Sequence, residues 1–321
     1  MNRFRSLDGW RGLSILFVLA GHLLPLGPKS WQMNTPVAGA GMALFFILSG
    51  FLITNILMRD NNIFRFLVRR FMRIVPLAWF VMGVTLILIA ANQSTFLAHF
   101  LFYANWPPMF LTRATSHLWS LCVEIQFYVL IAFLVASFKS RAFILLPLLS
   151  IAVTLYRYIN GVEMAINTYY RVDEILAGCI LALLYKDNAY SISITRFFRA
   201  LNPVYIFPLL LLSAHPEAAW VNYFRPYIAM LLIGSTLFSE NKQWCNRMLD
   251  SKFLFYIASI SFALYVFHGG LRETWLGEGD ILEKYIKRPL FFVVIFILAH
   301  VSTFYYEKYW IRLGKKITTK K

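Results

Sequence analysis

The sequence predicts an all-α integral membrane protein, a bundle of about ten transmembrane helices with both termini in the cytoplasm. Of its 321 residues, 59% are hydrophobic and only 14% are charged, whereas a soluble domain has roughly 25% charged residues. Apolar stretches of near-spanning length recur along the whole chain, and basic residues gather in alternate connections between them. These three observations together exclude an ordinary soluble domain.

Each apolar stretch approaches the roughly 20 residues that a helix needs to cross a bilayer. The ten stretches cover residues 7–26, 37–58, 74–92, 118–138, 141–159, 171–186, 202–214, 222–239, 253–271 and 288–307. A further apolar segment, 96–109, ends in Pro107-Pro108 and is expected to be re-entrant or interfacial.

The orientation follows from the basic residues. If the N-terminus is cytoplasmic, most of the 31 Lys and Arg residues fall on the cytoplasmic side, as the positive-inside rule requires. This set includes Arg3, the run Arg65 to Arg73, Lys242, Lys320 and Lys321. Because the basic charge is explained by topology, we expect a lipid bilayer partner and no nucleic acid.

We expect one membrane domain over residues 1–321 with no appended soluble domain, no metal site and no permanently bound cofactor; the sequence leaves the oligomeric state open.

The first apolar stretch carries ionisable residues that need an explanation. Arg11 and His22 are separated by roughly 16 Å along a helix, about half of the hydrocarbon core. His22 would therefore lie well inside the membrane. An ionisable residue at that depth is costly unless it faces a partner or a wet cavity, so it is a functional candidate.

Four arginines, Arg65, Arg69, Arg70 and Arg73, precede the third span. At helical spacing Arg65, Arg69 and Arg73 share one face. Juxtamembrane arginines commonly serve as topology signals and lipid headgroup contacts. The alternative is an anion site, because the guanidinium fork suits phosphate.

Several polar residues in later spans can each be interpreted in two ways, as structural or as functional. Ser49 fits close helix packing as well as a substrate contact. Glu124 needs a partner from another helix or a wet cavity, and His117 lies seven residues before it. Asp173, beside Arg171, could cap a helix or grip a ligand, and His268 is a second deep imidazole.

The ordered set of motifs resembles the acyltransferase 3 family of integral-membrane acyltransferases. Leu7-Asp8-Gly9 with Arg11 resembles the family's opening, and Arg11 followed after ten residues by His22 matches its Arg-x10-His signature. The stretches FFILSGFLIT, RFMR, LWSLCVEIQFY, RVDEILAG and SFALYVFHG follow in family order, from about Ser6 to Tyr306. One departure is Ile125, which stands where the family often has a second glutamate.

This resemblance implies a membrane O-acyltransferase that acts in a bacterial inner membrane. It would move an acyl group, by default acetyl, from a cytoplasmic acyl-CoA to a hydroxyl of a cell-surface or lipid-linked glycan. The resemblance implies catalytic roles for His22, Glu124 and Arg11, and donor binding by Arg69, Arg70 and Arg73. It implies acceptor binding by Asp8, Ser49, His117, Trp119, Arg171, Asp173 and His268.

His22 could act as a general base or carry the acyl group transiently, and the sequence leaves both open. Two other classes of protein remain as alternatives. Buried ionisable residues in many helices also suit a transporter of protons or small solutes, although no inverted repeat supports it. A sensory or structural membrane protein without chemistry is the third interpretation.

Overall fold

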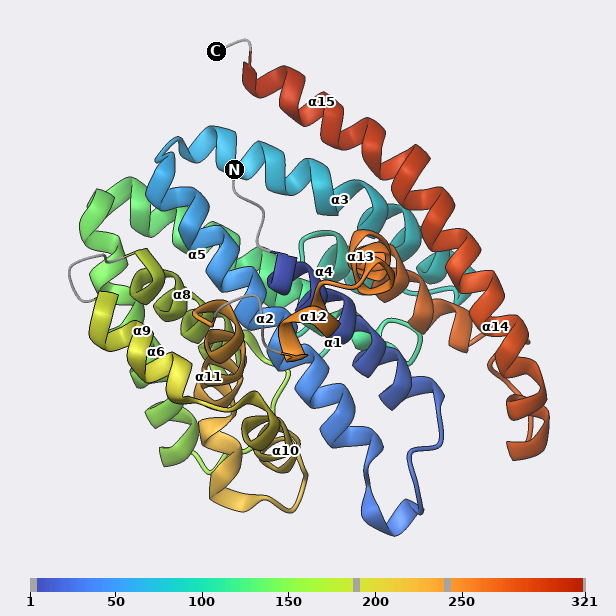
Figure 1. Ribbon diagram of the computed structural model, residues 1–321. Helices are drawn as coiled ribbons and strands as arrows, with labels where there is room; N and C mark the ends of the chain where they lie inside the picture. The colour runs from blue at the N-terminus through green and yellow to red at the C-terminus, as the bar shows by residue number, and fades with distance from the viewer. Residues whose placement is uncertain (1–4, 187–190, 240–243, 320–321) are drawn as a thin grey trace. The chain divides into compact units, whose positions relative to one another are not determined.

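The computed structural model describes residues 5–186, 191–239 and 244–319, and within these ranges the chain forms helices and no strand (Figure 1). Arg3, Lys242, Lys320 and Lys321, assigned above to the cytoplasmic side, lie outside the described residues. The α-helices are α1 (Arg5–Leu23), α2 (Asn34–Arg59), α3 (Ile63–Leu88), α4 (Gln93–Phe100), α5 (Trp119–Phe138), α6 (Ala142–Ile159), α7 (Thr168–Arg171), α8 (Asp173–Lys186), α9 (Ser191–Ala200), α10 (Pro203–Ser213), α11 (Arg225–Leu237), α12 (Trp244–Leu249), α13 (Lys252–Arg272), α14 (Ile281–Val301) and α15 (Lys308–Thr319).

A helix lies at each of the ten predicted spans. Within the described ranges, five helical stretches are long and apolar enough to cross a membrane, namely Asn34–Arg59, Ile63–Leu88, Ser116–Ile159, Lys252–Arg272 and Ile281–Thr319. An all-helical membrane fold is therefore supported. The number of crossings, the cytoplasmic termini and the single membrane domain stay predictions.

Two helices begin earlier than the apolar pattern indicates. The Asn62 side chain accepts a hydrogen bond from the Arg65 backbone N–H and starts α3, so the arginine run is helical. Asp280 does the same for the Glu283 N–H at the start of α14. Charged residues are compatible with the first turns of a helix, so the apolar stretch marks only part of each element.

The segment predicted to be re-entrant or interfacial is helical only in its first part. α4 ends at Phe100, and the chain then runs without regular structure to the 3₁₀ turn Ser116–Leu118. Buried polar groups hold this region together: His99 Nδ1 donates to the Thr95 carbonyl, and its Nε2 lies 2.8 Å from Thr115 Oγ1. Asn105 donates to the Ile166 carbonyl at 2.9 Å.

The described residues form two compact units. Unit 1 comprises Met1–Asn61, Leu134–Ala165 and Tyr169–Ser259, and unit 2 comprises Asn62–Phe133, Ile166–Thr168 and Ile260–Lys321. In unit 1, α2 packs against α1, α8 and α11 around a core that includes Leu44, Phe51 and Leu232 (Figure 1). In unit 2, α15 packs along α3.

Candidate active site

The residues predicted to form the site come from both units. Unit 1 holds Asp8, Arg11, His22, Ser49, Arg171 and Asp173. Unit 2 holds Arg69, Arg70, Arg73, His117, Trp119, Glu124 and His268.

One face of α1 presents Asp8, Arg11 and His22, all half-buried. The spacings of three and eleven residues bring them to the same side of a helix with 3.6 residues per turn. On other sides of α1 the backbone of a neighbouring element approaches closely. A Cβ added at Gly9 would lie 2.2 Å from the Leu249 carbonyl oxygen, and one at Gly12 would lie 2.4 Å from that of Leu254. Because a side chain at either position would collide with a backbone carbonyl, Gly9 and Gly12 allow α1 to pack closely against its neighbours in unit 1.

The end of α1, where His22 lies, is held by a side chain from α2. Pro25 has no N–H and so cannot complete the helical hydrogen bond to the Gly21 carbonyl. Asn34 Nδ2 donates to that carbonyl instead, at 2.8 Å, and also to the Leu24 carbonyl at 2.7 Å. The last turn of α1, and with it the backbone of His22, is thus anchored on both sides of the histidine.

Ser49 is buried in the packing of α2 against α8. A Cβ at the adjacent Gly50 would lie 1.9 Å from the Ile175 carbonyl oxygen, and one at Gly178 would lie 2.1 Å from that of Ile47. This reciprocal contact is the close helix packing that small residues permit. It supports the packing interpretation for this part of α2.

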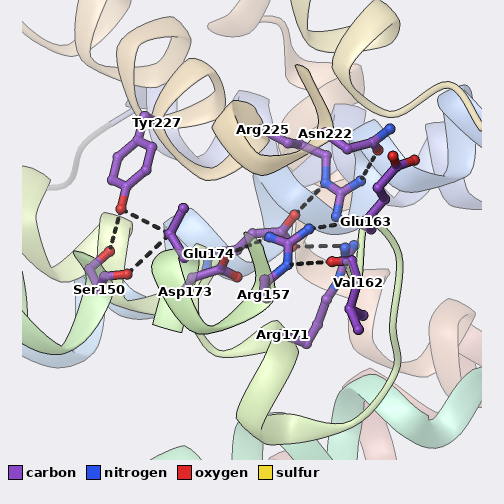
Figure 2. Close-up of polar contacts among 11 residues, drawn as sticks. Ser150, Arg157, Val162, Glu163, Arg171, Asp173, Glu174, Asn222, Arg225 and Tyr227 are labelled. Carbon is purple, nitrogen blue, oxygen red and sulfur yellow. Dashed lines mark hydrogen bonds and ion pairs between the residues drawn. The ribbon is translucent and has the colours of Figure 1, made fainter. Parts of the chain in front are cut away.

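Arg171 and Asp173 belong to a buried group of five charged side chains in unit 1 (Figure 2). Asp173 Oδ2 accepts from Arg157 Nη1 at 2.5 Å. Glu174 Oε1 accepts from Arg225 Nε at 2.7 Å, and Glu174 Oε2 lies 3.4 Å from Arg171 Nη2. With all five ionised, three arginines and two carboxylates leave one net positive charge.

Two of these arginines also bind neighbouring connections, Arg157 the one between α6 and α7 and Arg225 the turn before α11 (Figure 2). Arg157 Nη2 donates to the Glu163 carbonyl at 2.6 Å and its Nε donates to the Val162 carbonyl at 3.4 Å. Arg225 Nη1 donates to Asn222 Oδ1 at 3.2 Å. The sequence analysis did not identify Arg157, Glu174 and Arg225 as members of this group. A pattern that could have identified them is the presence of three arginines near the ends of apolar stretches together with the adjacent acidic residues Asp173 and Glu174.

Two histidines predicted from separate motifs meet in unit 2. The ring centroids of His117 and His268 are 4.6 Å apart in an edge-on arrangement, and both side chains are buried. His117 Nε2 lies 3.3 Å from the Val266 carbonyl oxygen and His268 Nδ1 lies 2.6 Å from that of Tyr265. Because a carbonyl only accepts, those two nitrogens carry the protons, and in the neutral rings His117 Nδ1 and His268 Nε2 hold the lone pairs.

Neighbouring residues fix this histidine pair. The Tyr265 hydroxyl donates to the His117 carbonyl and lies 2.6 Å from Ser120 Oγ. A Cβ at Gly269 would lie 1.9 Å from His117 Nδ1, so the His117 ring packs directly on the α13 backbone. Trp119, half-buried, follows His117 at the start of α5.

Glu124 is bound by a tyrosine one turn later on its own helix and lies in the field of an arginine from another helix. Its Oε1 accepts from the Tyr128 hydroxyl at 2.5 Å, and the charge of Arg70 from α3 acts on both Glu124 and Tyr128. Glu124 and Tyr128 are buried, and Arg70 is half-buried. Arg70 is therefore turned toward α5.

The other two predicted donor arginines point elsewhere. Arg69 Nε donates to Thr318 Oγ1 of α15 at 2.9 Å. Arg73 is exposed, and its charge acts on the buried Glu307. The three arginines thus share one helix but have different partners within unit 2.

The cysteines offer no competing nucleophile. Cys122 and Cys179 are buried, and Cys245 is half-buried on the short helix α12. Burial raises the pKa of the Cys245 thiol, which disfavours the reactive thiolate.

A family comparison then matches residues 4–307 to the acyltransferase domain of the acyltransferase 3 family. The chain belongs to the acyltransferase 3 family. The resemblance seen in the sequence is confirmed over nearly its whole length.

Named relatives of this acyltransferase 3 chain are O-acetyltransferases. The peptidoglycan O-acetyltransferase OatA of Listeria monocytogenes is 26% identical over 348 residues, covering 92% of this chain and 54% of the relative. The O-acetyltransferase OatA of Staphylococcus aureus is 25% identical over 312 residues, covering 82% of this chain and 49% of the relative. The chain spans about half the length of these curated relatives. No solved structure matches it.

Proposed function

We propose that this acyltransferase 3 protein is a membrane O-acetyltransferase. It transfers acetyl from a cytoplasmic acyl-CoA to a hydroxyl of a cell-surface or lipid-linked glycan, at a bacterial inner membrane. Family membership and the names of the relatives support the reaction class, and the peptidoglycan named for one relative supports a glycan acceptor. The observation that carries the proposal is His22, half-buried on the same face of α1 as Arg11 and anchored at its helix turn by Asn34.

His22 is assigned the proton transfer. In the neutral imidazole, one nitrogen takes the proton of the acceptor hydroxyl while that oxygen attacks the thioester carbonyl of the donor. The tetrahedral intermediate collapses with cleavage of the carbon–sulfur bond, and the imidazolium returns the proton to the CoA thiolate. In the covalent variant, the imidazole itself first accepts the acyl group and then passes it to the hydroxyl.

The arginines serve the donor. Acetyl-CoA carries phosphates, which suit the guanidinium groups of Arg69, Arg70 and Arg73. The link of Arg70 to Glu124 and Tyr128 makes its position depend on α5. Arg11 opposes the negative charge that develops on the thioester oxygen.

The remaining polar residues are assigned to the acceptor. A sugar hydroxyl can donate its proton to the lone pair of a neutral imidazole. The N–H groups of His117 and His268 face backbone carbonyls, so in unit 2 the pair offers its remaining ring nitrogens as hydrogen-bond acceptors. The other proposed acceptor residues are Asp8, Ser49, Trp119, Arg171 and Asp173.

The test is transfer of radiolabelled acetyl from acetyl-CoA to surface glycan, in membranes that hold equal amounts of each variant. Wild type and His300→Ala, a change at an exposed histidine, should label the glycan. His22→Ala should label it at least about a hundredfold less, as expected for losing a general acid–base group. Equal labelling by His22→Ala and wild type would refute the role of His22, and absence of label from every sample would refute the proposed donor and acceptor classes.

A further inference from the structure

A groove of about 740 Å³ lies within unit 2, between α3, α4, α5, the segment that joins α14 to α15, and the start of α15. This volume lies in the roughly 300–1,000 Å³ range of ligand sites. Every lining residue is apolar or aromatic, among them Met72, Val75, Trp79, Ile125, Tyr306 and Trp310. The groove therefore suits a hydrocarbon chain.

α3 and α15 approach each other closely beside the groove. At the meeting place, a Cβ on Gly314 would lie 2.9 Å from Met72 Cβ, and Arg69 binds Thr318 nearby. Trp310 and Tyr306 lie about one and two helical turns before Gly314, on the same side of the chain. At these two positions the chain carries large aromatic rings where Gly314 has no side chain, and both rings line the groove.

Two polar groups in the walls have partners on the backbone. Trp79 Nε1 donates to the Phe100 carbonyl at 3.0 Å, and the Tyr306 hydroxyl donates to the Pro76 carbonyl at 3.3 Å. Ile125, at the position where the family often has a second glutamate, also lines the groove. In this chain that position adds a hydrocarbon side chain to the wall and no charge.

Basic residues accompany the lining residues along α3 and α15. Residues 63–76 of α3 and 308–319 of α15 contain no acidic residue. Their basic residues are Arg65, Arg69, Arg70, Arg73, Lys308, Arg312, Lys315 and Lys316. The four on α15 are exposed, and the preceding Glu307 is buried. A basic amphipathic helix of this kind is attracted to anionic lipid.

We propose that the groove binds one acyl chain of an anionic phospholipid, whose phosphate is held by the basic residues of α15. The apolar walls select a chain, and the surplus of positive charge beside them selects an anionic over a zwitterionic headgroup. The side involved is the one that the sequence predicts to be cytoplasmic. The proposal does not depend on acyl transfer, because binding can be measured without turnover.

The experiment measures lipid retained by the purified full chain in detergent, by native mass spectrometry, with phosphatidylglycerol and phosphatidylcholine in equal amounts. Brominated chains add a second readout, because bromine in the groove quenches the fluorescence of Trp79 and Trp310, two of the nine tryptophans. Wild type should retain phosphatidylglycerol preferentially, and its fluorescence should fall. Lys308→Gln with Arg312→Gln should lower this retention on the order of tenfold, since each charge near an anionic lipid contributes.

Two further variants separate the chain site from the charge. Ile125→Glu places a carboxylate in the groove wall, and Val75→Phe narrows the groove without adding a tryptophan, so each should reduce the quenching. Val75→Phe should also leave the melting temperature within a few degrees of wild type. The control is Arg59→Gln with Lys252→Gln, which removes two exposed basic residues of unit 1 and should leave retention unchanged. Equal retention of both lipids, or equal loss in the control and the α15 variant, would overturn the proposal.

Discussion

The contact of His117 with Gly269 shows how one missing side chain can position an imidazole. Gly269 and Gly270 are adjacent in α13, yet a Cβ would meet His117 Nδ1 at 1.9 Å from the first and Thr85 Oγ1 at 3.3 Å from the second. Gly269→Ala should therefore displace His117 and lower acetyl transfer strongly, at a stability cost of about 1–3 kcal/mol. Gly270→Ala is the matched control and should change both quantities little. Glycan labelling and thermal melting of the two variants check this, and equal activity would contradict it.

The five buried charges in unit 1 should respond unequally to substitution. Arg157→Met removes one positive charge and leaves two arginines and two carboxylates, whereas Asp173→Asn leaves three arginines against one carboxylate. Breaking a buried ion pair costs about 3–5 kcal/mol when a charge is left without compensation. Asp173→Asn should therefore lower the melting temperature more than Arg157→Met, and the double variant should recover part of the loss. A larger loss in Arg157→Met would contradict this account.

At the scale of whole helices, the packing of α2 on α8 rests on Gly50 and Gly178. Gly178→Ala places a methyl group 2.1 Å from the Ile47 carbonyl oxygen, so the two backbones must separate. We expect a loss of about 1–3 kcal/mol in stability. Gly83→Ala in α3 is the control: its Cβ would have an ordinary 3.5 Å contact with Phe100, and alanine favours a helix by about 1 kcal/mol over glycine. The two variants should shift the melting temperature in opposite directions, and a downward shift in both would refute this.

The helices at the ten predicted spans followed from apolar length, but several of their ends did not, and α9, α12 and α15 lie outside those spans. The Asn62 and Asp280 caps extend α3 and α14 into charged sequence, where an apolar pattern has no signal. Side-chain partners were harder still. Arg157 pairs with Asp173 from a different helix, and His117 packs against α13 about 150 residues later. Glu124 could be predicted to need a partner, but only the fold identifies Arg70.

For the molecule as a whole, the basic residues predict an even number of crossings with both ends in the cytoplasm. A reporter active only in the cytoplasm, fused after Lys321, should therefore be active, and one inserted at the exposed Glu278, in a connection predicted to be external, should be inactive. The same inserts with a reporter active only outside should give the reverse pattern. Activity of the cytoplasmic reporter at Glu278 would overturn the predicted orientation.

The hydrogen bond from Asn34 to the end of α1 links the residues that positions 25 and 34 can carry in related proteins. The proline removes one backbone donor at the end of α1, and the amide of Asn34 replaces it. In a relative with another residue at position 25, the backbone supplies that donor and position 34 is released from the requirement. The two positions should therefore vary together, with the amide retained wherever proline is present, and this pairing could be used to align the loop that joins α1 to α2 among distant members of the family.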